Sequence, residues 1–421
     1  MMLEDLALAL AVGNRNHRLK IDDSGVNNGV LHDELLIDVL CRLPARILMR
    51  CVCVCRGWYR LITDVCVPRV TPSLPLLGID VRLRRRPRIF REKILYPSGS
   101  GSGSDSKIRI HLPVLPIEPQ CNTFFIPAAA DLLVDSCSGL ELYVHHSKHR
   151  YILWNPTMRQ YIPIPFPTVK PPAFAAVALH LGPSESVDIK IFAFPELEPK
   201  ANEHNLHIHS LSAGKWGEHK VQYEHPVDAA TLLDRCTYLN GKLFRLSYNG
   251  LLVWYTLKLK KDNINIVDVS YDYIELPNRG VGDRRKCIGS CMGRLRYAWT
   301  NFRLKLKIWV LSLDTREWIF RHYINLQALA NNSQLVAFQA MSGVPLGFLP
   351  LAFDAHSDAI IVWTQNCIFS YRRNSGNPVL LRCGKHNDAL LEESPLRAFP
   401  LTHCLVSLAM WGGKTPSFKC K

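Results

Sequence analysis

The sequence predicts a small all-α module followed by an all-β domain, the latter a β-propeller of about six blades. Residues Leu31–Asp64 carry apolar side chains at the spacing of amphipathic helices. From about residue 121 onward, short runs rich in β-branched and aromatic residues are separated by turn residues, a pattern typical of strands. From Tyr161 to Trp216 is 55 residues and from Trp216 to Trp318 is 102, which is close to one and two blades of about 40–50 residues. An irregular pair of β-sandwich sheets is the alternative fold.

The composition is that of a folded chain and excludes wholesale disorder or a fibrous repeat. Hydrophobic residues make up 48% of the 421 residues and charged residues 21%, close to the averages of globular proteins. The length allows two or three domains. The formal net charge of +15 makes nucleic acid, an anionic membrane or an acidic protein possible partners.

The start of the chain argues against a secretory or membrane-bound protein. Its apolar run carries Glu4 and Asp5 where a signal peptide would be basic. No apolar stretch reaches the ~18–20 residues of a membrane span. We therefore expect a cytoplasmic and/or nuclear protein with no membrane partner, in which the 14 cysteines are thiols rather than disulfides.

The helical module follows residues 1–29, which are polar and are predicted to form a mobile leader. Its first helix is predicted from apolar residues that share one helical face, and Pro44 ends it. These residues are Leu36, Val39, Leu40 and Leu43. Two further short helices are predicted, around Leu48 and around Trp58. Three short helices cannot bury all their apolar surface among themselves, so this module implies a partner.

Residues 67–120 are predicted to be a basic and Gly/Ser-rich linker. The run Arg82–Lys93 is strongly basic, and Ser98–Ser106 is flexible in composition. The basic run is interpreted as a solvated linker or a nuclear import signal, with nucleic-acid contact as the alternative. Phe90 is its single aromatic residue, so a stacking platform for single-stranded nucleic acid is not evident, and we expect no nucleic-acid partner.

The β domain is predicted to begin near residue 121 and end near residue 415. Hairpin turns are expected around Gly139, Gly241 and Gly293. A propeller ring is commonly closed by pairing a late strand with an early one, so Phe399–Trp411 should be structurally necessary. Tryptophans at repeated positions are predicted to pack between blades: Trp154, Trp216, Trp254, Trp309, Trp318 and Trp363.

No residue pattern predicts a catalytic centre, so we expect a protein that is not an enzyme. The sequence contains no phosphate-binding glycine loop, no serine nucleophile elbow and no paired-histidine zinc motif. Cys51 and Cys55 share a helical face, but no second pair lies at zinc-finger spacing. Cys287 and Cys291 are four residues apart in a strand region and do not converge on a metal without other ligands. We therefore expect no metal and no cofactor.

Two histidine clusters are interpreted as exposed turn residues rather than as a metal site or a general base. They comprise His145, His146 and His149, and His204, His207 and His209. Strand alternation would place His207 and His209 on one face, but no carboxylate or cysteine at useful spacing completes a site.

The helical segment resembles the F-box, the module that docks a substrate receptor onto the Skp-type adaptor of a cullin–RING ubiquitin ligase. The resemblance is carried in register, without a gap, by Leu31, Asp33, Glu34, Leu35, Leu36, Val39, Leu40, Arg42, Leu43, Pro44, Leu48, Arg50, Val54, Cys55, Trp58, Leu61 and Ile62. It departs at His32, where the family has proline, and at Ile47, where a small polar residue is usual. The resemblance implies an adaptor surface formed or supported by Leu31, Leu35, Leu36, Leu40, Leu43, Pro44, Val54, Cys55, Trp58 and Leu61.

The β domain is similar to the F-box-associated domains of plant F-box proteins, with a kelch-like propeller architecture. The resemblance is carried by the segments Leu132–Tyr143, Ile152–Pro165, Lys307–His322 and Leu349–Trp363. The implied organisation is an F-box at residues 30–66 and a propeller at 121–415. The implied function is that of a non-catalytic subunit that brings a target protein to the ligase. The alternative is a carbohydrate- or small-ligand-binding propeller whose helices serve for assembly.

Overall fold

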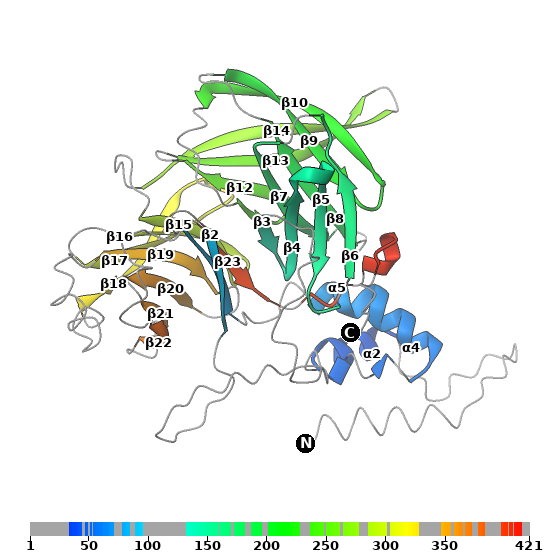
Figure 1. Ribbon diagram of the computed structural model, residues 1–421, viewed down its shortest axis with the longest axis horizontal. Helices are drawn as coiled ribbons and strands as arrows, with labels where there is room; N and C mark the ends of the chain where they lie inside the picture. The colour runs from blue at the N-terminus through cyan, green and yellow to red at the C-terminus, as the bar shows by residue number, and fades with distance from the viewer. Residues whose placement is uncertain are drawn as a thin grey trace, which may run out of the picture.

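The fold consists of a helical module and a ring of antiparallel sheets (Figure 1). The computed structural model describes residues 33–43, 47–48, 51–52, 54–70, 78–84, 89–95, 132–158, 160–169, 172–181, 187–195, 201–227, 236–247, 250–261, 264–277, 285–300, 304–327, 347–354, 358–364, 367–372, 378–383, 397–402, 404–406 and 408–414.

The helical module forms as its apolar periodicity predicts. Helix α2 spans Asp33–Cys41, and a helix made of α4 (Arg56–Arg60), η1 (Leu61–Cys66, with π-helical hydrogen bonds) and α5 (Val67–Val70) runs on without a break in helical backbone angles. Cys55 caps the second helix, because its Sγ accepts a hydrogen bond from the Trp58 backbone N–H at 3.4 Å. The core of the module contains Leu40, Leu43, Leu48, Trp58 and Ile62, all buried.

Within the described residues, five four-stranded antiparallel sheets form the blades of the propeller. Their strands are β3 (Leu132–Cys137), β4 (Leu140–His145), β5 (Arg150–Asn155) and β6 (Gln160–Pro165); β7 (Phe174–Leu181), β8 (Val187–Phe194), β9 (Ala201–Ser210) and β10 (Lys215–Val227); β11 (Cys236–Leu239), β12 (Lys242–Leu246), β13 (Gly250–Lys261) and β14 (Ile264–Glu275); β15 (Lys286–Cys291), β16 (Arg294–Thr300), β17 (Lys305–Leu311) and β18 (Trp318–Asn325); and β19 (Phe348–Phe353), β20 (Ala359–Thr364), β21 (Cys367–Arg372) and β22 (Val379–Cys383). Short 3₁₀ turns lie at η3 (His146–Lys148) and η6 (Leu408–Trp411).

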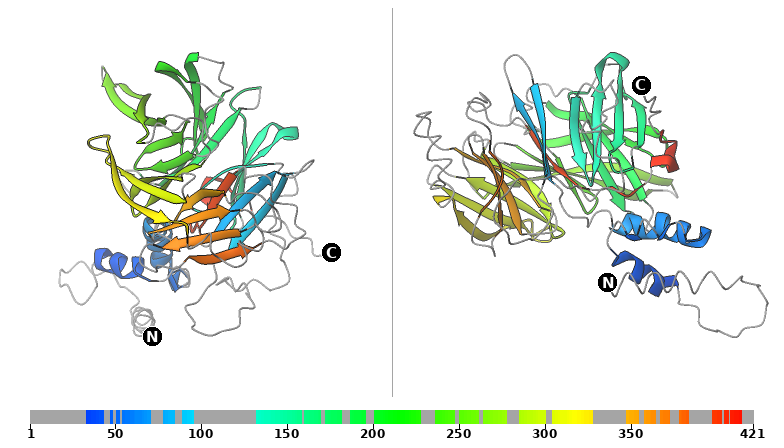
Figure 2. Two further views of the ribbon diagram at one scale, coloured as in Figure 1. Left: turned by 90° about the vertical axis from the view of Figure 1, so that its left-hand side faces the viewer. Right: turned by 60° about the horizontal axis from the view of Figure 1, so that its bottom comes forward.

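A sixth sheet has three strands and completes the ring. Strands β1 (Gly78–Arg84) and β2 (Ile89–Leu95) form a hairpin, and β1 also pairs with β23 (Arg397–Leu401) near the other end of the chain. The first strands of the five blades contact one another in order, and β23 contacts both β19 and β3. The blue β1 and β2 lie beside the orange strands of the fifth blade in Figure 2. The prediction of about six blades is therefore confirmed as five full blades and a closing sheet.

This closing sheet differs from what the sequence predicted for residues 67–120. The described residues of the basic run, 82–84 and 89–93, lie in the paired strands β1 and β2 rather than in a linker. The predicted pairing of an early strand with a late one is present between Gly78 and Leu401, in the region predicted to be structurally necessary. The segment Ser98–Ser106 lies outside the described residues.

The repeat that predicted the blades is visible at equivalent places in three of them. Tyr161, Trp216 and Trp318 each lie at the start of the fourth strand of a blade. The indole Nε1 of Trp216 donates to the Pro165 carbonyl at 3.0 Å, and that of Trp318 donates to the Glu275 carbonyl at 2.9 Å. Each acceptor lies at the end of the preceding blade's fourth strand, so these tryptophans join neighbouring blades.

The three predicted hairpin turns are confirmed and explain why glycine is needed there. Gly139, Gly241 and Gly293 have φ values of 78°, 78° and 68°, and the residue before each also has positive φ. Two successive residues with positive φ make a two-residue turn whose twist matches that of the flanking strands. Met292 is the unusual first residue of such a pair, with φ 50° and 64% of its side chain exposed.

Candidate functional site

The surface of the helical module is apolar at positions where large side chains are normally buried. Leu35 on α2 is 58% exposed and Tyr59 on α4 is 54% exposed. Leu35 was predicted as an adaptor residue, whereas Tyr59 was not. Of the other predicted adaptor residues, Cys55 is exposed, and Leu36, Val54 and Leu61 are half-buried. Leu31 and Pro44 lie outside the described residues. The exposed residues Leu35, Cys55 and Tyr59 are therefore the ones that a protein partner could cover.

Three of the predicted adaptor residues lie in the core of the module instead. Leu40, Leu43 and Trp58 are 1%, 4% and 4% exposed. They belong to one buried cluster with Leu48 and Ile62, and α2 packs against the second helix at η1 and α5. A substitution at these three positions would therefore act through the fold of the module before it could act on docking.

The cysteines of the module behave as buried or capping thiols. Burial, together with the neighbouring Cys41 thiol, raises the pKa of the Cys66 thiol to about 12. Burial also raises the pKa of Cys51. These two groups are therefore protonated near neutral pH, whereas zinc binds the thiolate. Within the part of the chain that the structure describes, no three His, Cys, Asp or Glu side chains are grouped to hold a metal ion.

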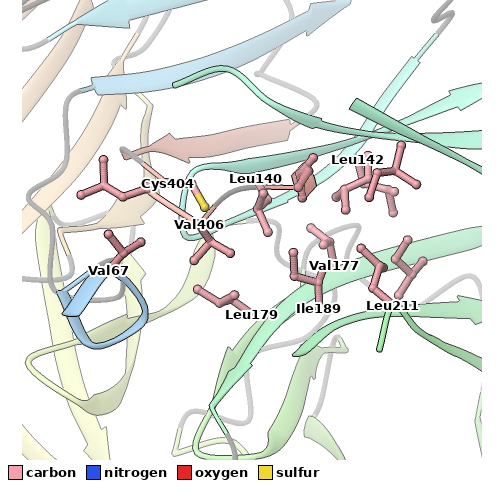
Figure 3. Packing of buried hydrophobic residues seen from close by; sticks show 14 of the residues in the cluster. Val67, Leu140, Leu142, Val177, Leu179, Ile189, Leu211, Cys404 and Val406 are labelled. Carbon is pink, nitrogen blue, oxygen red and sulfur yellow. The ribbon is translucent and has the colours of Figure 1, made fainter. Parts of the chain in front are cut away.

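The helical module is attached to the propeller by a shared hydrophobic core. Val67 and Val70 of α5 are buried with Cys404, Val406 and Leu408 of the C-terminal segment. Figure 3 shows Val67, Cys404 and Val406 packed with apolar residues of the first two blades. The C-terminal segment thus fills the space between the module and the ring.

The side chain of Asn155 fixes that segment to the first blade. Asn155 is fully buried, and its Nδ2 donates to the Cys404 carbonyl at 3.1 Å and to the Val406 carbonyl at 2.8 Å. Its Oδ1 accepts from the backbone N–H of Thr157 at 3.0 Å and of Met158 at 3.1 Å. One amide therefore orders the turn after β5 and holds the chain that packs on α5.

Four further hydrogen bonds reinforce this clamp. The Leu408 N–H donates to Gln160 Oε1 at 2.7 Å, and the Cys404 N–H donates to Thr157 Oγ1 at 3.2 Å. Tyr161 and Lys414 exchange backbone hydrogen bonds, each of 2.9 Å. The C-terminal segment is consequently part of the fold of the first blade.

The expectation that the histidines are exposed turn residues is wrong for four of the six. His145, His204 and His209 are buried on strands and His207 is half-buried on strand β9, whereas His146 and His149 are exposed. Aromatic rings cover two of them: the His204 ring stacks on Tyr223 at 5.0 Å between centroids, and the His209 ring lies edge-on to Trp216 at 5.1 Å. Burial, helped by the nearby Arg245 guanidinium, lowers the pKa of His204 to about 4, so it is neutral at pH 7.

The sequence did not indicate which charged side chains join blades. Arg245 of the third blade lies 3.8 Å above the Phe174 ring of the second blade. Arg296 of the fourth blade forms an ion pair with Asp358 of the fifth. Such contacts are set by the sheet arrangement, and an isolated arginine in a strand gives no local signal of its partner. The predicted packing of tryptophans between blades is confirmed at Trp254 and Trp309, each buried in a cluster that contains residues of two blades. Trp154 is instead buried among residues of its own blade.

Comparison with known proteins identifies both parts of the chain. A family model described as F-box domain matches residues 30–69, and one described as F-box protein At3g26010-like, beta-propeller matches residues 121–374. F-box protein At5g07610 of Arabidopsis thaliana is 22% identical over 321 residues, which are 71% of each chain. Among solved structures, YCF48 bound to D1 peptide aligns over 61% of this chain and 67% of its own, with 13% identity and a TM-score of 0.31. A streptogramin B lyase aligns over 62% of this chain and 84% of its own, with 12% identity and a TM-score of 0.30.

Among the described residues, no helix is long and apolar enough to cross a membrane.

Proposed function

Because the chain belongs to the family of F-box proteins with an At3g26010-like β-propeller, we propose that it recruits one target protein to a ubiquitin ligase. The combination of an F-box and a propeller supports a substrate-adaptor role in Skp–cullin–F-box ligases in general. The finer proposal is that the helical module docks on a Skp-type adaptor, and through it on cullin, while the propeller binds the target.

The docking half of the proposal rests on the exposed apolar residues of the module. Leu35 and Tyr59 are more than half exposed. Large apolar side chains of this kind are normally removed from water by a partner when they lie at a protein interface. Cys55, Leu36, Val54 and Leu61 are the further candidates on this surface. Leu40, Leu43 and Trp58 would support docking indirectly, because they hold the helices that present it.

The observation that carries the function is the shared core between α5 and the ring. Val67 and Val70 pack with the C-terminal segment that Asn155 clamps to the first blade. A module mounted in this way holds the adaptor and a propeller-bound target in one geometry. A ligase subunit with no chemistry of its own accelerates transfer by holding the reactants close together.

This role requires no catalytic residue in the chain. F-box propeller proteins are typically non-enzymatic adaptors. The buried histidines support this proposal, because His204 and His209 have pKa values lowered by burial and contact aromatic rings. A general base would instead need a pKa near the working pH and access to a substrate.

The test of docking uses substitutions of exposed residues in the full-length chain. Leu35→Asp and Tyr59→Asp should each weaken binding to a purified Skp-type adaptor by at least about tenfold, because an apolar interface cannot pair the new carboxylate. Val169→Asp is the matched control, since Val169 is 92% exposed and lies on the propeller. Circular dichroism should be unchanged in all three variants. Wild-type adaptor binding by both module variants would show that docking does not use this surface.

Recruitment is tested separately by comparing co-purifying proteins while the proteasome is inhibited. Proteins that bind the propeller should be retained by a chain lacking residues 31–64, whereas the adaptor and cullin should be lost. A target that disappears together with the adaptor would contradict recruitment by the propeller.

A further inference from the structure

The outer strand of the fourth blade, β18, exposes large apolar side chains along an open edge. Ile319, Phe320 and Tyr323 are 58%, 51% and 57% exposed. Among the described strands, β18 pairs with β17 alone, so the backbone groups on its other side have no strand partner. Open sheet edges are normally protected by charges or covered, and an apolar open edge is either an aggregation hazard or a binding site.

The equivalent strand of the second blade shows that this surface is not required by the fold. Trp216 on β10 and Trp318 on β18 occupy the same place, because each indole caps the preceding blade. Two residues further on, β10 has Glu218 where β18 has Phe320. Glu218 accepts a hydrogen bond from Asn205 at 2.6 Å, so that position on β10 is polar and satisfied within its own blade.

Cations lie beside one half of the β18 edge. Trp299, Lys307 and Tyr323 face one another across three strands and therefore share one face of the sheet. The Lys307 ammonium lies 6.0 Å from the Trp299 ring centroid, and the Lys305 ammonium lies 5.4 Å from that of Tyr323. Arg321, in the middle of β18, is exposed.

The other half of the edge is apolar. Phe320 packs edge-on against the buried Trp309 ring at 5.8 Å, and Ile319 follows Trp318 at the start of the strand. The acidic residues Asp314 and Glu317 lie before Trp318, away from Lys305 and Lys307. The edge therefore has an apolar half from Ile319 and a basic half toward Asn325.

We propose that β18 binds an extended segment of a partner protein that has apolar residues in one half and acidic residues in the other. The segment would add to the fourth blade as a fifth strand, with main-chain hydrogen bonds along the open edge. On the face that Phe320 shares with Lys305 and Lys307, its apolar residues would cover the Phe320 ring and its carboxylates would lie near the two ammonium groups. This inference deepens the proposed function, because it names the surface and the chemistry of the target.

A second copy of this chain fits the edge less well. Two copies of Ile319–Tyr323 paired antiparallel about a two-fold axis would place Arg321 directly opposite Arg321. Like charges at opposed positions destabilise a strand pair. Charge complementarity therefore favours an acidic segment over self-association.

The test measures fluorescence anisotropy of labelled peptides with the full-length chain, without the adaptor. The probe is about ten residues long, with valine and threonine alternating in one half and glutamate and threonine in the other. One comparison peptide has lysine in place of glutamate, and a second has proline at alternate positions, which removes main-chain donors. We expect the acidic probe to bind at least about tenfold more tightly than either.

Variants of β18 locate the site. Phe320→Glu copies the residue of β10 and should weaken the acidic probe by at least about tenfold, and Lys307→Glu should also weaken it. Val169→Glu is the control that adds a carboxylate elsewhere and should bind normally. Tyr323→Thr serves as a second apolar variant if Phe320→Glu fails to fold.

Several results would overturn the proposal. These are equal binding of the acidic and lysine probes, unchanged binding by the β18 variants, or a dimer in sedimentation experiments that Phe320→Glu dissociates. Displacement of the acidic probe by single-stranded oligonucleotide at equal concentration would assign the surface to nucleic acid instead. Because the adaptor is absent, failure here leaves the docking result of Leu35→Asp unaffected, and the two proposals fail independently.

Discussion

Replacement of Asn155 by alanine should loosen the attachment of the C-terminal segment to the first blade. The side chain is fully buried and takes part in four hydrogen bonds, two to carbonyls of the C-terminal segment and two from backbone N–H groups of its own turn. Alanine keeps the strand but removes every one of these bonds. The backbone carbonyls of Cys404 and Val406, two buried residues, would then lose the hydrogen bonds that Asn155 Nδ2 donates to them.

The size of the effect follows from these four bonds. A hydrogen bond within a protein contributes about 0.5–1.5 kcal/mol net, and a buried group left unpaired costs about 1–3 kcal/mol. The turn amides of Thr157 and Met158 are partly buried, so water can replace Oδ1 there at little cost. We therefore expect Asn155→Ala to lower the free energy of unfolding by roughly 2–4 kcal/mol.

The assay is urea unfolding of the full-length chain, followed by tryptophan fluorescence. Asn205→Ala is the matched control, because the Asn205 amide makes one exposed hydrogen bond to Glu218. The control should change stability by less than about 0.5 kcal/mol. Limited proteolysis should also cut the Asn155→Ala variant first within the C-terminal segment. If Asn155→Ala and Asn205→Ala shift the urea midpoint equally, the side-chain amide does not hold the clamp.

Two further predictions concern pH and ring closure. His204 has a pKa of about 4 in the folded chain against an ordinary 6.5, so the unfolded chain takes up the proton first as pH falls, and stability decreases from about pH 6.5 down to pH 4. His204→Phe should remove about 2 kcal/mol of the stability loss at pH 5, measured by urea unfolding at pH 7 and pH 5; an unchanged slope would contradict the burial of a neutral histidine. A chain ending at residue 396 lacks β23 and the clamp and should be degraded rapidly by trypsin, whereas a chain ending at Lys414 should resist like the full-length protein. Equal resistance of both truncated chains would show that the ring does not need its closing strand.

Local signals in the sequence predicted the parts of this fold that local forces determine. Apolar spacing around Leu40 and Leu43 predicted α2, because one face of a helix must be buried. Gly241 and Gly293 predicted two-residue hairpins, because a turn with positive φ favours glycine. The interval from Trp216 to Trp318 predicted the blade length, because both indoles cap the previous blade.

The sequence could not predict contacts between distant segments. Gly78 pairs with Leu401, and no local pattern in the basic run Arg82–Lys93 indicates that its partner is a strand so far along the chain. Asn155 looks like an ordinary turn residue after a strand, and its donors are directed at Cys404 and Val406 only in the folded ring. The same holds for the division of the predicted adaptor residues into exposed and buried sets, which depends on how α2 packs against η1 and α5.

Closure of the ring and attachment of the helical module occur at the same place in the molecule. The chain leaves α5 at Val70 and enters the closing sheet at Gly78, and the strand that completes this sheet continues directly into the segment clamped by Asn155. That segment packs on Val67 and on the first blade at once. Any motion of the module against the propeller would therefore disturb the buried contacts that help close the ring, and the folding energy of the propeller opposes it. Under the proposed function, this attachment would keep the distance between adaptor and target constant without a separate rigid linker.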